Sequence, residues 1–251
     1  MRTVDFTTMY TKLPHPKLLE AIEVSWDRAV GFKKKECHQH TTEDQWGLII
    51  GRDGEYQFSM MDLTALKDTP NVFTKPIFLE LMTVLITDNH IWNGGDLKRQ
   101  VVGIPMGSPV SPHLANLFRY VVESKFVEEL IAKGNLEEAK RCEHTYAYID
   151  DLCTFEGPLP TEEHYGFPMT VDKEPKEVVN FLGTKITATK AGKPPRLGIV
   201  EKQEEWDFHI KYPHAGSNIP WNQGAAVFKG QLIRYAVICN NLWDFQTAAL
   251  R

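Results

Sequence analysis

The feature that most constrains this chain is a pair of adjacent aspartates inside an apolar and aromatic run. Asp150 and Asp151 stand between Tyr146-Ala-Tyr-Ile149 and Leu152-Cys153. Such a run is typical of a buried strand or a tight hairpin, where an unpaired carboxylate is costly. Two neighbouring anions also repel each other, and bound metal ions commonly supply the charge that offsets the repulsion. The pair therefore indicates a site that holds positive charge.

A third aspartate strengthens this interpretation. Asp5 lies in a second strand-like run, Thr3-Val-Asp-Phe-Thr7. Three aspartates on strand-like segments are typical of a magnesium site for phosphoryl transfer. The alternative is that they are ordinary surface or capping residues.

A segment rich in glycine and proline lies between these aspartates. It reads Gly103-Ile-Pro-Met-Gly-Ser-Pro-Val-Ser-Pro-His-Leu-Ala-Asn116. Gly103 and Gly107 oppose regular structure, and the sequence then predicts a helix with Ser111 as its cap and Pro112 at its first position, continuing to about Lys133. A glycine-bearing loop that enters a helix lets a ligand approach the backbone closely, which suits a nucleotide. An ordinary loop before a helix is the alternative.

Taken together, these segments resemble a known family. Asp5–His15, Gly103–Asn116 and Tyr148–Asp151 resemble motifs A, B and C of a reverse transcriptase palm. Among reverse transcriptases, the form DFTTMYTKLPH is most similar to those of Penelope-like retroelements. Asn180–Gly183 resembles the primer-grip turn, and Phe228–Asn240 resembles the thumb helix of the same family. The resemblance covers about residues 1–245 in order.

The resemblance implies an α+β fold of the right-hand polymerase type. We expect a palm over residues 1–184, with an antiparallel sheet backed by helices, and a small helical thumb over residues 185–251. The initiator methionine stands four residues before Asp5. We therefore expect the fingers to be largely absent, and a separate segment or protein to supply them.

The same resemblance implies an activity. The chain would be an RNA-directed DNA polymerase that adds deoxynucleotides to a primer 3′ end by two-metal phosphoryl transfer. Asp5 and Asp150 would bridge two Mg²⁺ ions, for which Mn²⁺ is a possible substitute. Asp151 would support the site, and the carbonyl of Phe6 would add a ligand.

Further positions match the nucleotide pocket of the family. Tyr10 lies where the family has a bulky residue that excludes a ribose 2′-hydroxyl, although a plain core tyrosine is the alternative. Met106 occupies a position where many relatives carry glutamine, and methionine is only a weak acceptor. Gly107 and Ser108 follow it against the incoming nucleotide.

The remaining sites concern the leaving group and the primer. Lys173 matches the motif D region and would protonate the leaving pyrophosphate, with Lys176 as a competitor for that role. Either lysine is otherwise a surface residue. The primer grip and the nucleic-acid contacts of the thumb would comprise Phe181, Leu182, Gly183, Lys229 and Arg234.

The charge balance bears on the partners. The net charge of −5 argues mildly against nucleic-acid binding. Residues 185–251, however, carry nine Lys and Arg against five Asp and Glu. An acidic palm that binds metal and a basic thumb suit an RNA template, a DNA or RNA primer and deoxynucleoside triphosphates. The alternative function is a domesticated, non-catalytic relative that binds nucleic acid or serves as a structural component of a larger complex.

Hydrophobic periodicity predicts several elements outside the motifs. Leu18, Leu19, Ile22 and Trp26 recur at helical spacing. The full set of predicted elements is a helix over 17–29, a hairpin of strands 46–51 and 55–60 around Asp53-Gly54, a helix over 76–91, a turn over 91–96 and a return strand over 98–102.

Cysteine use and hydropathy bear on the compartment. The four cysteines have no regular spacing, which indicates reduced thiols in an intracellular protein. We expect the nucleus or, alternatively, an organelle. No run of 18 apolar residues occurs, so we expect no membrane association. Cys37-His-Gln-His40 resembles half a zinc site but has no second ligand pair nearby.

Overall fold

A computed structural model describes residues 1–6, 8–37, 46–51, 54–60, 71–172, 174–190, 193–201 and 216–250. Its helices and small antiparallel sheets confirm the α+β class. The chain divides into two compact units. The first unit comprises Met1–Asp5, Lys140–Pro158 and Thr170–Arg251, and the second comprises Phe6–Ala139 and Leu159–Met169.

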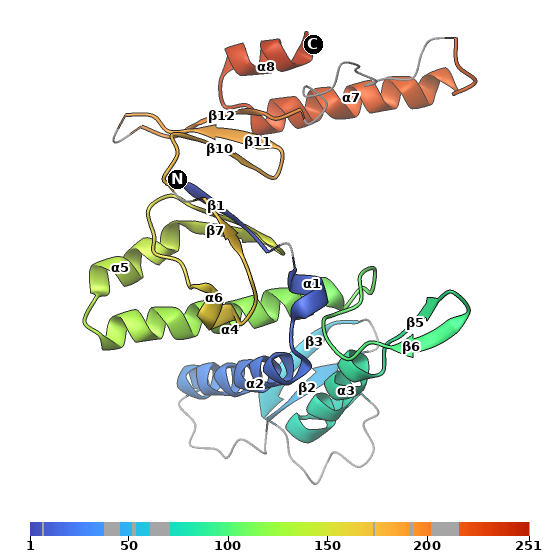
Figure 1. Cartoon of the computed structure of the whole chain (residues 1–251), viewed down its shortest axis with the longest axis vertical. Helices are drawn as coiled ribbons and strands as arrows, with labels where there is room; N and C mark the ends of the chain where they lie inside the picture. Colours follow the sequence, from blue (N-terminus) through green and yellow to red (C-terminus); the bar gives the residue numbers. More distant parts are fainter. Residues whose placement is uncertain are drawn as a thin grey trace. The chain divides into compact units, whose positions relative to one another are not determined.

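The first unit is built on a four-stranded antiparallel sheet (Figure 1). Its strands, in spatial order, are β7 (Thr145–Tyr148), β8 (Asp151–Thr154), β1 (Arg2–Asp5) and β9 (Thr170–Val171). The middle of the sheet is apolar, since Val4, Leu152 and Cys153 are all buried. Distant segments of the sequence thus form adjacent strands, and the candidate carboxylates lie at their ends.

A second, three-stranded sheet follows in the same unit. It contains β10 (Val178–Phe181), β11 (Thr184–Thr187) and β12 (Arg196–Ile199), all antiparallel. Val179 and Ile186 pack with Cys153 of β8, so the two sheets share one apolar cluster. β11 begins at Thr184, which is where the resemblance ends the palm. That domain boundary stays a prediction.

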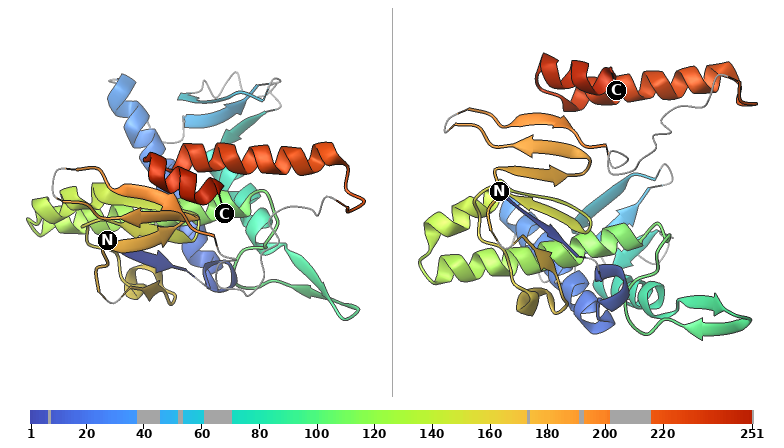
Figure 2. Two further views of the ribbon diagram at one scale, coloured as in Figure 1. Left: turned by 90° about the horizontal axis from the view of Figure 1, so that it is seen from above. Right: turned by 45° about the horizontal axis from the view of Figure 1, so that its top comes forward.

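Two helices complete the first unit. They are α7 (Trp221–Ile238) and α8 (Leu242–Ala249), and Figure 2 shows them in red beside the three-stranded sheet. Polar contacts join them to β12 and to the residues that follow it. The Tyr235 hydroxyl donates to Glu201 at 2.8 Å, and Arg196 donates two 2.6 Å hydrogen bonds to Asp244. α7 and α8 are thereby attached to the β12 side of the sheet.

The second unit is mainly helical. Two long helices, α2 (His15–Cys37) and α4 (Ser111–Ala132), pack together, and α3 (Lys75–Thr87) packs on α2. Leu18 and Ile22 on α2, and Leu114 and Phe118 on α4, are buried. Four short elements accompany them: α1 (Met9–Lys12), α5 (Leu136–Arg141), which crosses to the first unit, α6 (Glu162–Tyr165) and the hairpin of β5 (His90–Asn93) and β6 (Asp96–Arg99).

The predicted hairpin at residues 46–60 is confirmed as an antiparallel pair. β2 (Trp46–Ile50) pairs with β3 (Tyr56–Met60), and β4 (Val72–Thr74) joins on the other side of β2. Arg52 and Asp53 in the predicted turn lie outside the described residues, as do His38–His40 and the side chain of Cys37 in the suggested zinc half-site.

Several predicted boundaries were wrong. α2 continues past Ala29 because Val30 extends the buried stripe of Leu18, Ile22 and Trp26 by one more turn. α3 ends at Thr87 rather than residue 91, since the Asn89 side chain donates to the Leu85 and Ile86 carbonyls and closes the helix. The return strand is Asp96–Arg99 rather than 98–102.

Candidate active site

Asp5 and Asp151 are paired directly in the first unit. In the antiparallel ladder between β1 and β8, Asp5 is the register partner of Asp151. Residues that face each other in such a ladder point to the same side of the sheet, with Cβ atoms about 4.5–5.5 Å apart. Both aspartates are half-buried. Two like charges opposite each other destabilise a sheet unless other groups offset their repulsion.

Asp150 lies in the turn that connects β7 to β8. The turn consists of Ile149 and Asp150, since Tyr148 pairs with Asp151. Ile149 has φ of 52°, a left-handed conformation that is rare for a β-branched residue. Such strain costs on the order of 1–3 kcal/mol and occurs mostly at functional sites. The strained turn holds Asp150 next to the paired aspartates.

The donor set bears on which metal these carboxylates could hold. In the described part of the chain, no three His, Cys, Asp or Glu side chains come together as a ready-made metal site. Mg²⁺ in nucleotide-transfer sites needs only one or two carboxylates, because phosphate oxygens and water complete its shell. Asp5 and Asp150 form no ion pair with a described Lys or Arg. A site of this kind needs no third protein carboxylate, so the donor set is compatible with a Mg²⁺ ion.

Phe6 follows Asp5 and belongs to the second unit. Its ring is buried and makes edge contacts with Tyr165 and Phe167, with ring centroids 4.7 Å and 5.7 Å away. Its carbonyl oxygen, the predicted metal ligand, accepts a hydrogen bond from the Met9 amide at 3.0 Å. This carbonyl therefore lies at the start of α1.

The predicted gate and the glycine-rich loop are joined by backbone hydrogen bonds. Tyr10 is half-buried in α1, and its carbonyl accepts from the Ile104 amide at 2.8 Å. Farther along the loop, Met106 is 73% exposed, whereas Ser108 is half-buried. Gly107 has φ of +90°, a conformation that favours glycine. These nucleotide-pocket candidates thus lie on two segments of the second unit that a backbone hydrogen bond joins.

The prediction that Ser111 caps the following helix was wrong. The cap residue of α4 is Val110, and Ser111 is already the first helical residue. The Ser111 hydroxyl instead donates to the Pro105 carbonyl at 2.6 Å. Ser111 therefore stabilises the glycine-rich loop, because its hydroxyl bonds to a loop carbonyl and not to an amide of the helix.

The predicted primer-grip turn contacts the predicted thumb helix. Phe181 ends β10, and Leu182 and Gly183 form the turn to β11, with φ of 51° and 75°. The Gly183 carbonyl accepts from the Val200 amide at 2.9 Å. A Cβ atom on Gly183 would lie only 2.9 Å from Nη2 of Arg234 on α7. The structure therefore brings together the grip turn and one of the two thumb cations.

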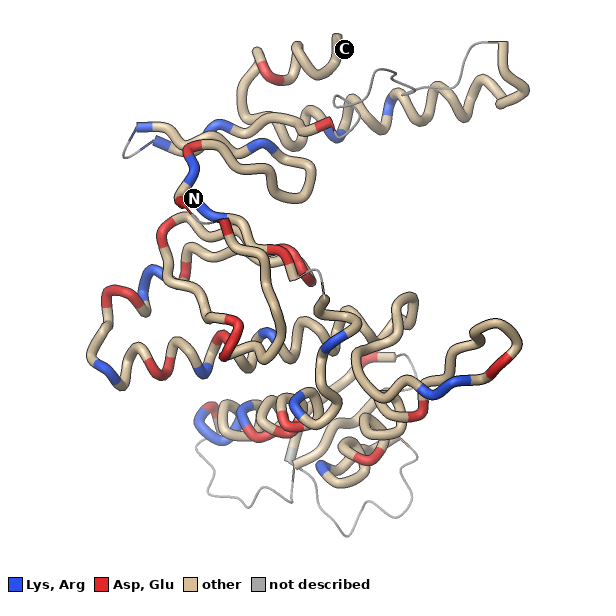
Figure 3. The backbone as a smooth tube through the Cα atoms, viewed as in Figure 1, with Lys and Arg blue, Asp and Glu red and all other residues tan. Residues whose placement is uncertain are grey.

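The other predicted cations have different surroundings. Lys229 on α7 is exposed, and Figure 3 shows blue segments along that helix. Lys173 lies outside the described residues. Its competitor Lys176 pairs with Asp172 at 2.5 Å, and this hydrogen bond is the main reason that the pKa of Asp172 is lowered. Asp172 also accepts hydrogen bonds from Thr3, so it links Lys176 to β1.

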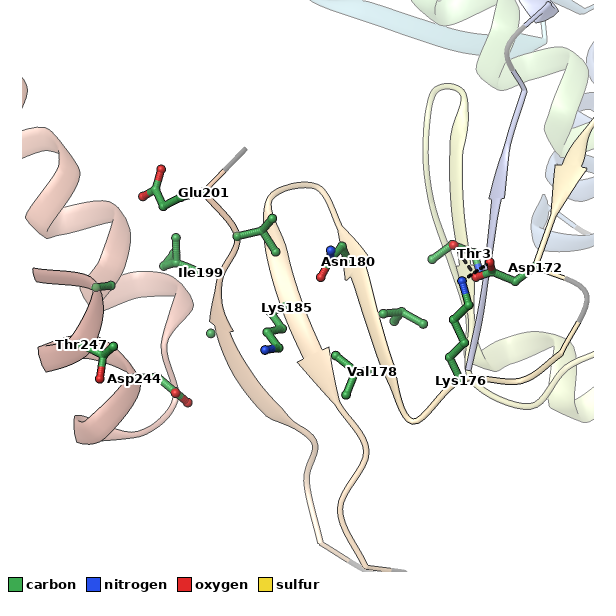
Figure 4. Close-up of a pocket in the computed structure, with 14 residues that line it drawn as sticks. Thr3, Asp172, Lys176, Val178, Asn180, Lys185, Ile199, Glu201, Asp244 and Thr247 are labelled. Atoms are coloured by element: carbon green, nitrogen blue, oxygen red, sulfur yellow. Dashed lines mark hydrogen bonds and ion pairs between the residues drawn. The ribbon is translucent and has the colours of Figure 1, made fainter. Parts of the chain in front are cut away.

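One cavity of the first unit is separate from the carboxylates. It has a volume of about 620 Å³ and lies along the second sheet and α8 (Figure 4). None of Asp5, Asp150 and Asp151 lines it. Its polar lining mixes both charges and includes Thr3, Asp172, Lys176, Lys185, Glu201 and Asp244.

A buried polar group in the second unit was missed by the sequence analysis. The Tyr165 hydroxyl donates to Glu123 at 3.3 Å, and Arg119 lies 3.6 Å from the same carboxylate. Burial raises the pKa of Glu123, opposed by the nearby Arg119 charge. Nε and Nη1 of Arg119 have no hydrogen-bond partner in the described part of the chain. The contact of Tyr165 with Phe6 makes this group a support for the residue after Asp5.

Comparisons with known proteins add nothing to this geometry. No protein-family model and no curated protein matches the chain. Among the described residues, none of the helices combines the length and the apolar character that a membrane crossing requires.

Proposed function

We propose that this chain is the palm and thumb of an RNA-directed DNA polymerase similar to those of Penelope-like retroelements. The observation that carries the proposal is the pairing of Asp5 with Asp151, beside Asp150 in a strained turn. The segment that resembles motif A thus lies on the strand next to the segment that resembles motif C. This arrangement supports a two-metal site. The order of the three motifs along the chain supports the same function.

In this proposal, Asp5, Asp150 and Asp151 would hold Mg²⁺ when the nucleotide is bound. The bound ions would supply positive charge that favours ionisation of the primer 3′-hydroxyl and stabilises the departing pyrophosphate. The aspartates provide the negative charge that retains these ions, and the Ile149 turn fixes their orientation. The Phe6 carbonyl would add a ligand, as the resemblance implies.

The second unit would position the nucleotide. The Tyr10 ring excludes a ribose 2′-hydroxyl, and Met106 packs against the base or sugar because its side chain is largely exposed. Gly107 allows the close approach of the ligand to the backbone. Ser108 contributes a hydroxyl at the start of the helical segment.

The first unit would position the primer. The turn of Leu182 and Gly183 contacts the primer end, and Arg234 stands behind it. Arg234 and Lys229 place two positive charges on α7, a helix without acidic residues. Phosphate contacts of this kind fix a nucleic acid without reading its sequence.

Primer extension on an RNA template tests the proposal. The chain, alone and with a fingers segment supplied, is given Mg²⁺ and deoxynucleotides, and we expect extension in the supplemented form. Asp150→Asn should abolish extension, whereas Asp88→Asn, at a side chain 66% exposed at the end of α3, should not. Equal activity of wild type and Asp150→Asn would refute the catalytic role. Absence of extension in both forms would favour the non-catalytic, nucleic-acid-binding alternative.

A further inference from the structure

His15 ends the segment that resembles motif A, and the proposed chemistry leaves it without a role. It is 8% exposed at the first position of α2. Its Nε2 atom lies 2.7 Å from the carbonyl oxygen of Gly103, 88 residues later in the chain. A carbonyl only accepts hydrogen bonds, so this nitrogen carries the proton and donates. The ring is therefore held as a donor toward the glycine-rich loop.

Two backbone hydrogen bonds extend this contact. The Gly103 amide donates to the Leu13 carbonyl at 2.8 Å, and the Ile104 amide donates to the Tyr10 carbonyl at 2.8 Å. The Gly103 carbonyl accepts from His15 and the Gly103 amide donates to Leu13, so both backbone groups of Gly103 bond to the segment from residue 10 to residue 15. We call these three hydrogen bonds the loop clamp.

The clamp depends on a close approach that only glycine allows. Gly103 has φ of +82°, and a Cβ atom there would overlap the Tyr10 carbonyl oxygen. The partner segment is itself anchored, because Met9 and Leu13 are fully buried. The start of the loop and the α1 turn are thus fixed as one body within the second unit.

We infer that His15 is a positioning residue that holds the glycine-rich loop in register with Tyr10. This inference rests on the proposed function, in which Tyr10 excludes the 2′-hydroxyl and Met106 to Ser108 contact the nucleotide. Tyr10 belongs to one of the two segments that the clamp joins, and Met106 to Ser108 follow Gly103 and Ile104 on the other. A change in the clamp therefore alters the spacing between the gate and the loop, and with it the choice between deoxynucleotides and ribonucleotides.

The clamp itself is tested without any activity. His15→Phe keeps an aromatic ring but removes the donor, whereas His15→Gln keeps an N–H donor. Hydrogen–deuterium exchange of residues 101–110 should become about tenfold faster in His15→Phe, the effect of one lost hydrogen bond, and stay near wild type in His15→Gln. His90→Phe, at an exposed histidine of the same unit, is the control. Unchanged exchange in His15→Phe would overturn the inference.

The unmodified protein provides a second test if His15→Phe fails to fold. Nitrogen NMR of the histidine rings should show His15 protonated at Nε2, and a ring protonated only at Nδ1 would exclude the donor role.

The effect of the clamp on the proposed reaction is measured as selectivity between deoxynucleotides and ribonucleotides. In primer extension, His15→Phe should lower the preference for deoxynucleotides over ribonucleotides about tenfold, and His15→Gln should restore most of it. Unaltered selectivity in an active His15→Phe variant would overturn the positioning role. If the wild type extends no primer, the proposed function fails, while the exchange result still decides whether the clamp exists.

Discussion

Asp5 and Asp151 face each other across adjacent antiparallel strands, although 146 positions separate them in the sequence. In an ordinary sheet this pairing would be a disadvantage, since like charges at facing positions repel. Under the proposed function, a bound metal ion would offset this repulsion, so the paired aspartates would favour cation binding.

Removing one of these charges should change stability in opposite directions with and without metal. Asp5→Asn should stabilise the metal-free protein by about 0.5 kcal/mol, because it relieves the repulsion. The same change should reduce the stabilisation that millimolar Mg²⁺ confers by mass action. Denaturant unfolding with EDTA and with Mg²⁺ measures both effects. Asp96→Asn on the β5–β6 hairpin is the control, and an undiminished Mg²⁺ effect in Asp5→Asn would contradict the site.

Truncating the predicted gate should relax sugar selection. Tyr10→Ala should lower the preference for deoxynucleotides by about tenfold or more, because room opens for the 2′-hydroxyl. Incorporation rates with each nucleotide type provide the measurement. Tyr120→Ala, at a tyrosine 51% exposed on α4, should leave the preference unchanged. A Tyr10→Ala variant with lower stability and intact selectivity would instead identify Tyr10 as a core residue.

The grip turn should gain stability from a better turn residue. Leu182 has φ of 51° and is 48% exposed, so it bears backbone strain with little compensating burial. Leu182→Asn creates Asn-Gly, the preferred pair for a two-residue hairpin turn, and should stabilise the protein by about 1 kcal/mol. Thermal unfolding measures the gain. Leu97→Asn on β6 should give no gain, and a loss of stability in Leu182→Asn would show that the leucine side chain matters more than the strain.

Acid should weaken the contact between Asp172 and its partners. The hydrogen bond from Lys176 is the main reason that the pKa of Asp172 is lowered, with Thr3 adding to the effect. A lowered folded pKa contributes stability above the unfolded pKa of about 3.9, and this contribution disappears as the pH falls through the folded value. Asp172→Asn should therefore cost about 1 kcal/mol at pH 7 and almost nothing near pH 2. Urea unfolding across this range is the measurement, and a cost independent of pH would exclude the charge effect.

Local patterns in the sequence were enough to predict many of the elements. The stripe of Leu18, Ile22 and Trp26 predicted α2, and the apolar runs around Gly54 predicted the β2–β3 pair, because both depend on neighbours within one element. The end of α2 was misplaced, since the burial of Val30 depends on tertiary packing.

The sequence by itself determined the chemical character of this protein: three aspartates on strand-like segments, a glycine-bearing loop and a basic C-terminal region. Only the tertiary structure decided which of these groups meet. It set the register of Asp5 with Asp151, turned His15 toward Gly103 and brought Arg234 over Gly183. The physical reason is that register and close backbone approach come from packing between segments far apart in the chain, which no local pattern encodes.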